Sequence, residues 1–263
     1  MYKLIALDLD GTLLNSEKTI SQENQDAIAK ARENGVTVVL ASGRPIQGMR
    51  DKLNLLNINS NKDFVLCYNG SMVQNIGTGE IIHQQTIDGK AAKKIARLAE
   101  EMGVYVHAFS TEHGLITPKN NPYTDIEATI NGLEITEMNF ELLSDDHSII
   151  KVMMVAEPTL ITQTITQLAP ELRDEFTVVQ SAPFFLEFLN PLANKGIGVA
   201  AIAEHLGITA DEVMTMGDAE NDHHMIKYAG LGIAMSNAME ETKKIADHIT
   251  VSNDEHGVAQ CIK

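Results

Sequence analysis

Short apolar runs that alternate with helical patterns constrain the fold of this chain more than any other feature of its sequence. Leu4–Leu7, Val36–Ala41 and Phe64–Tyr68 are apolar stretches of strand length, which is typical of strands that are buried on both faces. Helical patterns lie between them, at about 21–34 and 45–56. Strand–helix–strand order of this kind predicts a parallel sheet with crossover helices, an α/β fold of the doubly wound type.

The middle of the chain follows a second pattern, in which a helix is followed by two strands. The predicted elements are a helix at 88–102, strands near 104–109 and 114–117, a strand at 149–156, a helix at 158–172, and strands near 176–180 and 184–189. The helix–strand–strand order occurs twice without clear residue identity, so the repeat is weak. We expect a separate α+β unit with an antiparallel sheet at 83–188.

The last part of the chain returns to the first pattern. Helices are expected at 195–206, 226–229 and 240–246, and strands at 213–216, 231–234 and 249–251. The simplest architecture is a discontinuous α/β core made of residues 1–82 and 189–263, interrupted by the inserted unit at 83–188. The two crossings of the chain between these parts are the expected hinges.

The charge balance excludes several classes of partner. The chain has 263 residues, with 20 basic and 36 acidic side chains and a formal net charge of −16. A surface this acidic repels nucleic-acid backbones and anionic membranes unless it contains a basic groove, and no run of Lys and Arg predicts one. We therefore expect neither a nucleic acid nor a membrane as a partner, and no motif indicates an oligomeric state.

The two cysteines, Cys67 and Cys261, do not form the spacing of a zinc site with each other or with histidines. We expect idle thiols in a reducing compartment. Acidic residues begin at Asp8, so we expect no secretory leader, and no apolar window approaches the roughly 18 residues of a membrane span. The expected location is the cytoplasm.

The strongest local signal is the segment Asp8-Leu9-Asp10-Gly11-Thr12, directly after the first apolar run. Ligands of doubly wound sheets bind beyond the carboxyl ends of the strands. Two carboxylates at such an end can converge on one small volume, where they repel each other unless a cation lies between them or one holds a proton. A bare D-x-D is more often a pair of solvated loop acids, but its place after a buried strand and before Gly-Thr makes this one much more specific.

Two further segments are weaker signals by themselves. Ser42-Gly43-Arg44 follows the second apolar run, and a hydroxyl with adjacent backbone N–H groups can form a small anion site. Lys195 is the first residue of a predicted helix, where its positive charge interacts unfavourably with the helix dipole. An anion bound to its ammonium would compensate this unfavourable interaction. The alternatives are a loop Ser beside a flexible Gly, and a solvated surface Lys.

The segment 217–222 (GDAEND) adds carboxylates at Asp218 and Asp222, directly after a predicted strand. Oxygen ligands without a Cys or His cluster suit Mg²⁺. Because the carboxyl ends of parallel strands share one edge, we expect this segment to meet Asp8, Asp10 and Ser42 in one pocket, with Lys195 beside them. Active sites for phosphoryl transfer combine these groups: carboxylates, a metal cation, a hydroxyl and a lysine.

These residues resemble the haloacid dehalogenase superfamily of phosphotransferases, and more narrowly the Cof-type bacterial sugar-phosphate phosphatases with a type IIB cap. The four motifs of that family match DLDGT at 8–12, Ser42 in ASGR, Lys195 in NKG, and GDAEND at 217–222. Two further segments, 68–70 (YNG) and 232–238 (GIAMSNA), also resemble the family. The resemblance covers essentially the whole chain. It implies a Rossmann-like doubly wound core, with the inserted α+β unit at 83–188 as the cap.

The resemblance also implies a role for each matching residue. Asp8 is the expected nucleophile, which forms an aspartyl-phosphate, and Asp10 the expected acid and base. Mg²⁺ is expected on Asp8, the backbone carbonyl of Asp10, and Asp218. The expected phosphate ligands are the side chains of Ser42, Lys195 and Asn221 and the backbone N–H groups of Leu9 and Gly43. The expected supporting residues are Thr12, Arg44, which reaches the substrate, and Asp222, an indirect ligand or a nearby acid.

The predicted function is a Mg²⁺-dependent phosphatase of small phosphate esters, with phosphosugars or related metabolites as the expected substrate class. Three alternatives stay open: a phosphomutase or phosphotransferase on the same scaffold, a receiver-type module phosphorylated on an Asp, and a regulator that binds a phosphosugar without hydrolysing it. A receiver is far shorter and has no inserted cap. The intact set of Asp8, Asp10, Lys195 and Asp218 argues against the regulator.

Overall fold

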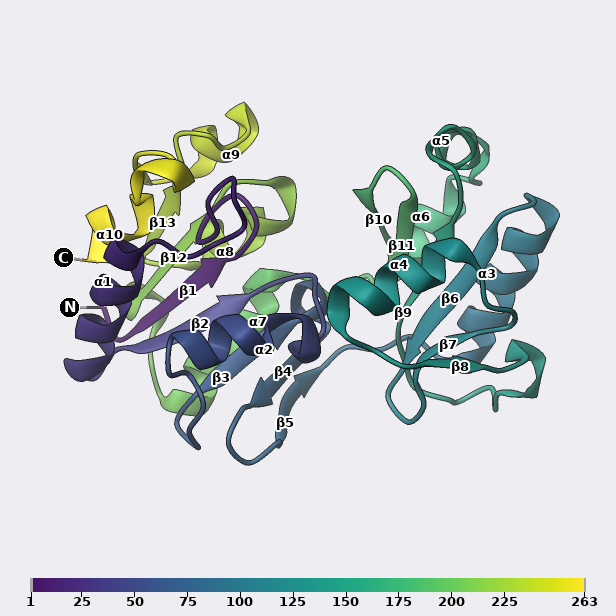
Figure 1. The fold of residues 1–263 in the computed structure, drawn as a ribbon, viewed down its shortest axis with the longest axis horizontal. Helices are drawn as coiled ribbons and strands as arrows, with labels where there is room; N and C mark the ends of the chain where they lie inside the picture. The colour runs from purple at the N-terminus through teal and green to yellow at the C-terminus, as the bar shows by residue number, and fades with distance from the viewer. Residues whose placement is uncertain (1, 263) are drawn as a thin grey trace. The chain divides into compact units, whose positions relative to one another are not determined.

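The computed structural model describes residues 2–262, which form two compact units (Figure 1). Unit 1 comprises the residues up to Gln84 and those from Asn194 onward, and unit 2 comprises Gln85–Ala193. The boundaries expected from the sequence, 82/83 and 188/189, lie two and five residues earlier in the chain.

Unit 1 is built on an eight-stranded sheet with the order β14-β13-β12-β1-β2-β3-β4-β5. Its strands are β1 (Leu4–Asp8), β2 (Thr37–Ala41), β3 (Phe64–Cys67), β4 (Met72–Asn75), β5 (Ile81–Gln84), β12 (Val213–Gly217), β13 (Leu231–Ala234) and β14 (His248–Ile249). All pairs from β14 to β3 are parallel, whereas the β3–β4 and β4–β5 pairs are antiparallel. The predicted α/β class with a parallel central sheet is confirmed, and an antiparallel edge extends it.

Helices cover the sheet of unit 1. They are α1 (Gln22–Glu33), α2 (Ile46–Leu55), α7 (Lys195–Leu206), α8 (His223–Tyr228), α9 (Glu240–Ile245) and α10 (Gly257–Ile262). Leu4 and Ala6 of β1 pack in one core cluster with Val199 of α7 and Met225 of α8. The intervening residue Ile5 points to the opposite face and is buried too, so this strand is apolar without alternation. α1 lies beside α10, which brings the two ends of the chain together (Figure 1).

Two helices of unit 1 begin at side-chain caps. Ser21, the expected cap of α1, accepts a hydrogen bond from the Asn24 N–H at 3.3 Å. Asn194 caps α7 by accepting the Ile197 N–H at 3.0 Å. Such caps satisfy N–H groups that have no partner inside the helix, and the second one fixes the place where Lys195 begins α7.

Unit 2 contains a six-stranded sheet with the order β10-β11-β9-β6-β7-β8. Its strands are β6 (Tyr105–Ser110), β7 (Gly114–Thr117), β8 (Ile135–Glu137), β9 (Ile149–Val155), β10 (Thr177–Ala182) and β11 (Phe185–Leu189), and its helices are α3 (Gly89–Glu101), α4 (Pro122–Asn131), α5 (Pro158–Gln167) and α6 (Glu171–Glu175). The pairs are antiparallel except β7–β8, which is parallel. The sheet is antiparallel as expected, except where β8, a strand that was not predicted, pairs with β7.

The two faces of the sheet in unit 2 differ in character. Val106 and Ala108 of β6 pack in one apolar cluster with Ile95 of α3. His107, between them in sequence, points the other way, where its Nδ1 lies 3.0 Å from Thr124 Oγ1 of α4. Burial raises the free energy of the charged imidazolium and lowers the pKa of His107 to about 3, with a smaller effect of Lys151. The α4 face of the sheet therefore carries polar groups inside the unit.

Five elements were not predicted from the sequence: β4, β5, α4, β8 and α10. The hairpin of β4 and β5 lies at the edge of its sheet. Both end residues of β5 are exposed and the two between them are half-buried, so the strand shows no clear alternation of buried and exposed residues. The predicted helix at 158–172 is divided into α5 and α6. Pro170 lies between them and cannot donate a helical hydrogen bond. The last strand is at His248–Ile249 rather than 249–251.

Asp63, just before β3, ties the loop ahead of this strand to α1. It is buried and accepts hydrogen bonds from Arg32 NH1 at 2.6 Å, from the Ser60 N–H at 2.8 Å and from Ser60 Oγ at 2.7 Å. Burial by itself raises the pKa of Asp63, but these donors and the charge of Arg32 outweigh burial, so the pKa is lowered. The stabilisation is therefore present above the ordinary carboxyl pKa and is lost as the pH falls through the lowered value.

We expect Asp63→Asn to lower the free energy of unfolding by about 1–3 kcal/mol at neutral pH, because buried donors lose a charged acceptor. Denaturant titration measures this difference, which shrinks below about pH 4, because the carboxyl of the unfolded chain takes up its proton there before the native carboxyl does. Asp51→Asn, on an exposed position of α2, is the matched control and leaves the unfolding curve unchanged. Equal stability of wild type and Asp63→Asn at neutral pH contradicts the assignment.

Candidate active site

Three carboxylates meet at the carboxyl edge of the parallel sheet in unit 1. Asp8 is the last residue of β1, and Asp218 follows β12 directly. β1 and β12 pair in parallel, with Leu7 opposite Met216, so the two acids leave adjacent strands at the same edge. One carboxylate oxygen from each of Asp8, Asp218 and Asp222 lies within 4.8 Å of the others.

Lys195 places a fully buried ammonium among these acids. Its Nζ lies 2.5 Å from Asp8 Oδ1 and 2.7 Å from Asp222 Oδ1. Burying a charge is costly unless it is paired, and here one ammonium faces two carboxylates with a third nearby. Burial by itself lowers the pKa of Lys195, but the charges of Asp222 and Asp8 outweigh it and raise this pKa.

Burial and mutual repulsion disfavour the ionised forms of Asp8 and Asp218. Burial, and then the charge of Asp222, raise the pKa of Asp8 well above its ordinary value, although Lys195 opposes the shift. The same two causes raise the pKa of Asp218. With one lysine for three carboxylates, the cluster has negative charge in excess, and a divalent cation would compensate it.

The donor set of the cluster fits Mg²⁺. Every potential ligand atom in it is a carboxylate oxygen, the hard donor that Mg²⁺ prefers. Ligands on opposite sides of Mg²⁺ are about 4.2 Å apart, from its oxygen distance of about 2.1 Å. Oxygens within 4.8 Å of one another can therefore share one ion after small side-chain movements.

The turn after β1 is shaped around Asp218. Gly11 has φ +92°, and a Cβ at this position would lie 2.4 Å from Asp218 Oδ2. Thr12 Oγ1 donates to Asp218 Oδ1 at 2.8 Å, and the Leu9 carbonyl accepts the Leu14 N–H at 2.8 Å. The glycine is therefore needed both for its backbone conformation and because a carboxylate occupies the space of a side chain.

Asp222 organises the loop that carries Asp218. Its Oδ2 accepts the backbone N–H groups of Asp218 at 2.9 Å and Ala219 at 3.1 Å, while Oδ1 accepts from Lys195. Gly217 permits this approach, because a Cβ there would lie 2.4 Å from Asp222 Cβ. Asp222 is fully buried, and it holds both the Asp218 loop and the ammonium of Lys195 in place.

Asp10 is paired with two cations. Arg44 binds its carboxylate with Nε at 3.2 Å and NH2 at 2.8 Å, and Lys18 Nζ is 2.9 Å away. Burial by itself raises the pKa of Asp10, but the hydrogen bonds and charges of Lys18 and Arg44 outweigh it and lower the pKa. The carboxylates of Asp8 and Asp10 therefore lie in different electrostatic environments.

The predicted phosphate-binding residues are joined through Asn69. Asn221 Nδ2 donates to Asn69 Oδ1 at 3.1 Å, and a Cβ at Gly43 would lie 3.0 Å from Asn69 Nδ2. Ser42 is buried, and its Oγ accepts the Arg44 N–H at 3.2 Å. The structure therefore brings Ser42, Gly43 and Asn221 together around a residue that was not predicted as part of the site.

Asn69, Lys18 and Asn237 are the residues that sequence reasoning missed. Asn69 adopts φ +55° in a Tyr-Asn-Gly segment, and this segment was the signal available for it. Asn237 Nδ2 donates to the Gly11 carbonyl at 2.9 Å. Asn237 lies in the segment 232–238, which also resembles the family, whereas Lys18 lies outside every motif and only its contact with Asp10 reveals it.

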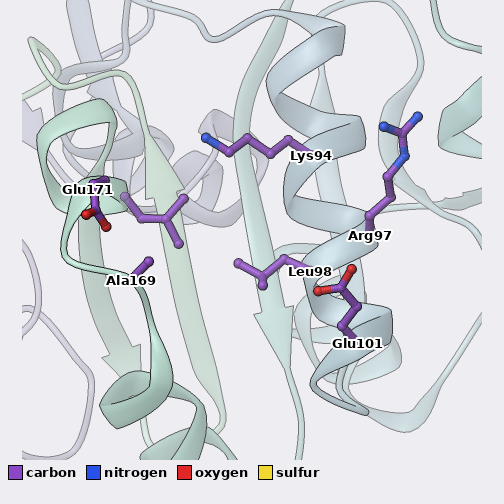
Figure 2. A pocket seen from close by; sticks show the side chains of 7 residues that line it. Lys94, Arg97, Leu98, Glu101, Ala169 and Glu171 are labelled. Carbon is purple, nitrogen blue, oxygen red and sulfur yellow. The ribbon is translucent and has the colours of Figure 1, made fainter.

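Unit 2 contains a hollow of a different kind, of about 380 Å³, between α3 and α6 (Figure 2). Figure 2 shows Lys94 extending from α3 toward the side of Glu171, and Arg97 pointing away from it. Lys94 is paired with Glu175, and Arg97 NH2 lies 2.6 Å from Glu141. The cations at this hollow are thus already neutralised, and it lacks the converging carboxylates found in unit 1.

Comparison with known proteins assigns the chain to a family. The model of the haloacid dehalogenase-like hydrolases matches residues 5–262. The chain is a haloacid dehalogenase-like hydrolase. The Bacillus subtilis protein YxeH, which carries the word phosphatase in its name, is 38% identical over 100% of this chain and 97% of its own length. The predicted family and the prediction of a phosphoric ester hydrolase are both confirmed.

Solved structures of this hydrolase family share the fold over the full chain. A haloacid dehalogenase-like hydrolase from Bacteroides thetaiotaomicron has a TM-score of 0.87 and 34% identity, with 100% of this chain and 98% of that chain covered. The subclass IIB sugar phosphatase BT4131 has a TM-score of 0.78 and 25% identity, over 99% of this chain and 97% of its own. Within residues 2–262 of this hydrolase, no helix has both the length and the apolarity to cross a membrane.

Gly11→Ala is expected to lower kcat/KM for phosphate esters at least ~100-fold, because displacement of a catalytic group by about 1 Å is enough for such a loss. The new Cβ would push the Asp218 carboxylate out of the acidic cluster. Steady-state kinetics measures the effect. Gly35→Ala is the matched control, since Gly35 has φ +84° with no atom within 4 Å of the added Cβ; it strains the backbone but keeps the activity. Equal kinetics of the two variants contradict the argument.

Asp218→Asn is expected to stabilise the metal-free enzyme by about 1 kcal/mol at neutral pH, because it removes one negative charge from a crowded buried site. The amide oxygen of the new side chain can still accept the hydrogen bond from Thr12. Thermal unfolding in a chelator measures this gain. Added Mg²⁺ should raise the unfolding temperature of the wild type and not that of the variant; the same Mg²⁺ response in both proteins contradicts a metal site at Asp218.

Proposed function

We propose that this hydrolase is a Mg²⁺-dependent phosphatase that hydrolyses small phosphate esters through a phosphorylated Asp8. The observation that carries the proposal is the buried group of Asp8, Lys195, Asp222 and Asp218 at the sheet edge. It supplies a nucleophile, a fixed cation and an all-oxygen metal site in one place. These are the parts that phosphoryl transfer requires.

Asp8, Asp218 and the backbone carbonyl of Asp10 would hold the Mg²⁺, which when bound neutralises phosphate charge and lowers the pKa of the Asp8 carboxyl. An Asp8 oxygen attacks the phosphorus, and the bond to the leaving alkoxide oxygen breaks. A water molecule then attacks the phosphorus of the aspartyl-phosphate, which releases inorganic phosphate and regenerates the carboxylate.

Asp10 is proposed as the proton carrier of both steps. It gives a proton to the leaving alkoxide and takes one from the attacking water. The contacts with Arg44 and Lys18 lower the pKa of Asp10 and so favour its carboxylate form, which is the form required for the second step. For the first step Asp10 must carry a proton, so its contacts with these two cations have to loosen when substrate binds.

The transferring phosphoryl group is proposed to bind Lys195, Ser42, Asn221 and the backbone N–H groups of Leu9 and Gly43. The burial of Lys195 and Ser42 and the contact of Asn221 with Asn69, beside Gly43, support this set. Thr12 and Asp222 hold Asp218 and its loop in place. Fixed donors of this kind stabilise developing charge without reorganisation during the reaction.

Unit 2 is proposed as the type IIB cap of the enzyme, and sugar phosphates or related metabolites as its substrates. Unit 2 is an insertion between β5 and α7. The likeness to the sugar phosphatase BT4131 extends over both units. The two cysteines are free thiols, as in the reducing cytoplasm where such metabolites occur, and we propose that compartment for the reaction.

Asp8→Asn is expected to lower the release of p-nitrophenol from p-nitrophenyl phosphate by about 1000-fold or more, because the nucleophile is lost. Chelation of the metal from the wild type should abolish turnover as well. Asp51→Asn, an exposed acid-to-amide change on α2, serves as the matched control and retains full activity. Turnover that persists both in Asp8→Asn and in chelator contradicts the proposed site.

The same assay, extended to a panel of sugar phosphates, separates hydrolysis from transfer. A phosphatase releases inorganic phosphate without any added acceptor, in an amount equal to the ester consumed. A phosphomutase instead converts one sugar phosphate to its isomer with little phosphate release. If more isomer forms than phosphate is released, the enzyme is a mutase that uses the same Asp8, and the proposal of hydrolysis is wrong.

A further inference from the structure

A second group of metal-ligating side chains lies within unit 2. It consists of Glu112 and His113, in the turn between β6 and β7, and His147, just before β9. One ligand atom from each residue lies within 4.8 Å of the other two. Two imidazoles and one carboxylate form a donor set that differs from the all-carboxylate cluster of unit 1.

The spacing of these atoms suits a shared ion better than direct hydrogen bonds. Glu112 Oε2 lies 3.9 Å from His113 Nε2 and 3.9 Å from His147 Nδ1. Hydrogen bonds between nitrogen and oxygen are about 2.7–3.2 Å long. Two ligands of a tetrahedral zinc ion, each about 2.1 Å from it, are about 3.4 Å apart. A contraction of about half an ångström would therefore bring the Glu112 oxygen and each histidine nitrogen to the spacing of two zinc ligands.

The orientation of His147 is set by Ser110. Its Nε2 lies 2.8 Å from Ser110 Oγ, and this oxygen also accepts the backbone N–H groups of Glu112 at 3.1 Å and His113 at 3.0 Å. This contact holds the ring with Nδ1 toward Glu112. Zinc at Nδ1 requires the tautomer with the proton on Nε2; because Ser110 Oγ has two lone pairs, it then accepts the hydrogen bond from Nε2 in place of one of the two backbone N–H groups. Histidine ligands of metals usually have their other ring nitrogen held in this way.

The backbone holds the two segments together before any ion binds. β6 pairs with β9, with Ser110 opposite Ile149, and the Thr111 N–H donates to the Ser148 carbonyl at 3.2 Å. The two segments are thus held side by side by strand pairing, which reduces the cost of ordering them. The rings of His113 and His147 are stacked, with centroids 5.4 Å apart and an angle of 7° between planes. Because an imidazole binds a metal in its own plane, the more exposed ring of His113 would turn from this position to share an ion with His147.

We propose that unit 2 binds one zinc ion through Glu112 Oε2, His113 Nε2 and His147 Nδ1. Imidazole ligands favour zinc and related transition metals over Mg²⁺, so the two metal sites of the enzyme take different ions. Glu112 is 70% exposed and His113 34% exposed at their side chains, while His147 is 10% exposed. The ion would enter from the Glu112 side, where a water molecule completes the coordination, and it would cross-link the β6–β7 turn to the residues before β9.

Zinc binding is tested on the full-length enzyme with excess Mg²⁺ present, which keeps the acidic cluster of unit 1 occupied. A chromophoric chelator competes for zinc and reports its affinity and stoichiometry. We expect one zinc ion per chain, and an affinity reduced at least ~10-fold in His113→Gln, His147→Gln and Glu112→Gln. His248→Gln, at an exposed histidine of β14, is the matched control and binds zinc as the wild type does.

Thermal unfolding supplies the second readout. Zinc should raise the unfolding temperature of the wild type and of His248→Gln, and should leave that of the three site variants unchanged, because binding to the native state alone stabilises it. Glu112→Gln alters an exposed side chain, so it keeps the test valid if a histidine variant fails to fold. Wild-type zinc affinity in the Glu112→Gln and folded histidine variants, or no zinc bound by the wild type, overturns the proposal.

Discussion

The ion pairs of the buried Lys195 ammonium are the interactions on which the proposed active-site edge of unit 1 depends. Lys195 joins Asp8 at the end of β1 to Asp222 in the loop after β12, and it begins α7 behind the Asn194 cap. Without this cation, three acids at adjacent strand ends would repel one another in a site from which water is largely excluded. The pair interactions offset the cost of desolvating the lysine, and so a single side chain couples a strand, a helix and a loop.

The other parts of the site follow from that arrangement. Asp222 uses one oxygen for Lys195 and the other for the backbone of its own loop, which sets where Asp218 lies. Gly11 leaves room for Asp218. Asp10 lies in a contrasting environment, where Arg44 and Lys18 lower its pKa while burial raises that of Asp8. Different environments for two carboxylates in one motif allow them different roles, and a bound divalent cation would favour the ionised form of Asp8.

Unit 2 contrasts with unit 1 in the chemistry of its polar groups. Its Glu112, His113 and His147 combine imidazole with carboxylate and are held by strand pairing rather than by a buried counter-charge. Sequence motifs for zinc consist of ligands that recur at short intervals. Here one ligand comes from a segment beyond α4 and β8, so only the β6–β9 pairing brings it to the other two.

The sequence by itself determined the α/β class, the position of the insertion to within a few residues, and the place of Asp8 and Asp218 at strand ends, because apolar periodicity and strand-end motifs are local properties of the chain. It did not indicate α4, β8 or the antiparallel edge of β4 and β5. Only the tertiary structure decided that Lys195 pairs with Asp8, 187 positions away, and with Asp222, and that Asp10 is bound by Arg44. Such pairings depend on which side chains the packed sheet and helices bring together. The number of residues between two side chains does not predict how far apart they lie in the fold.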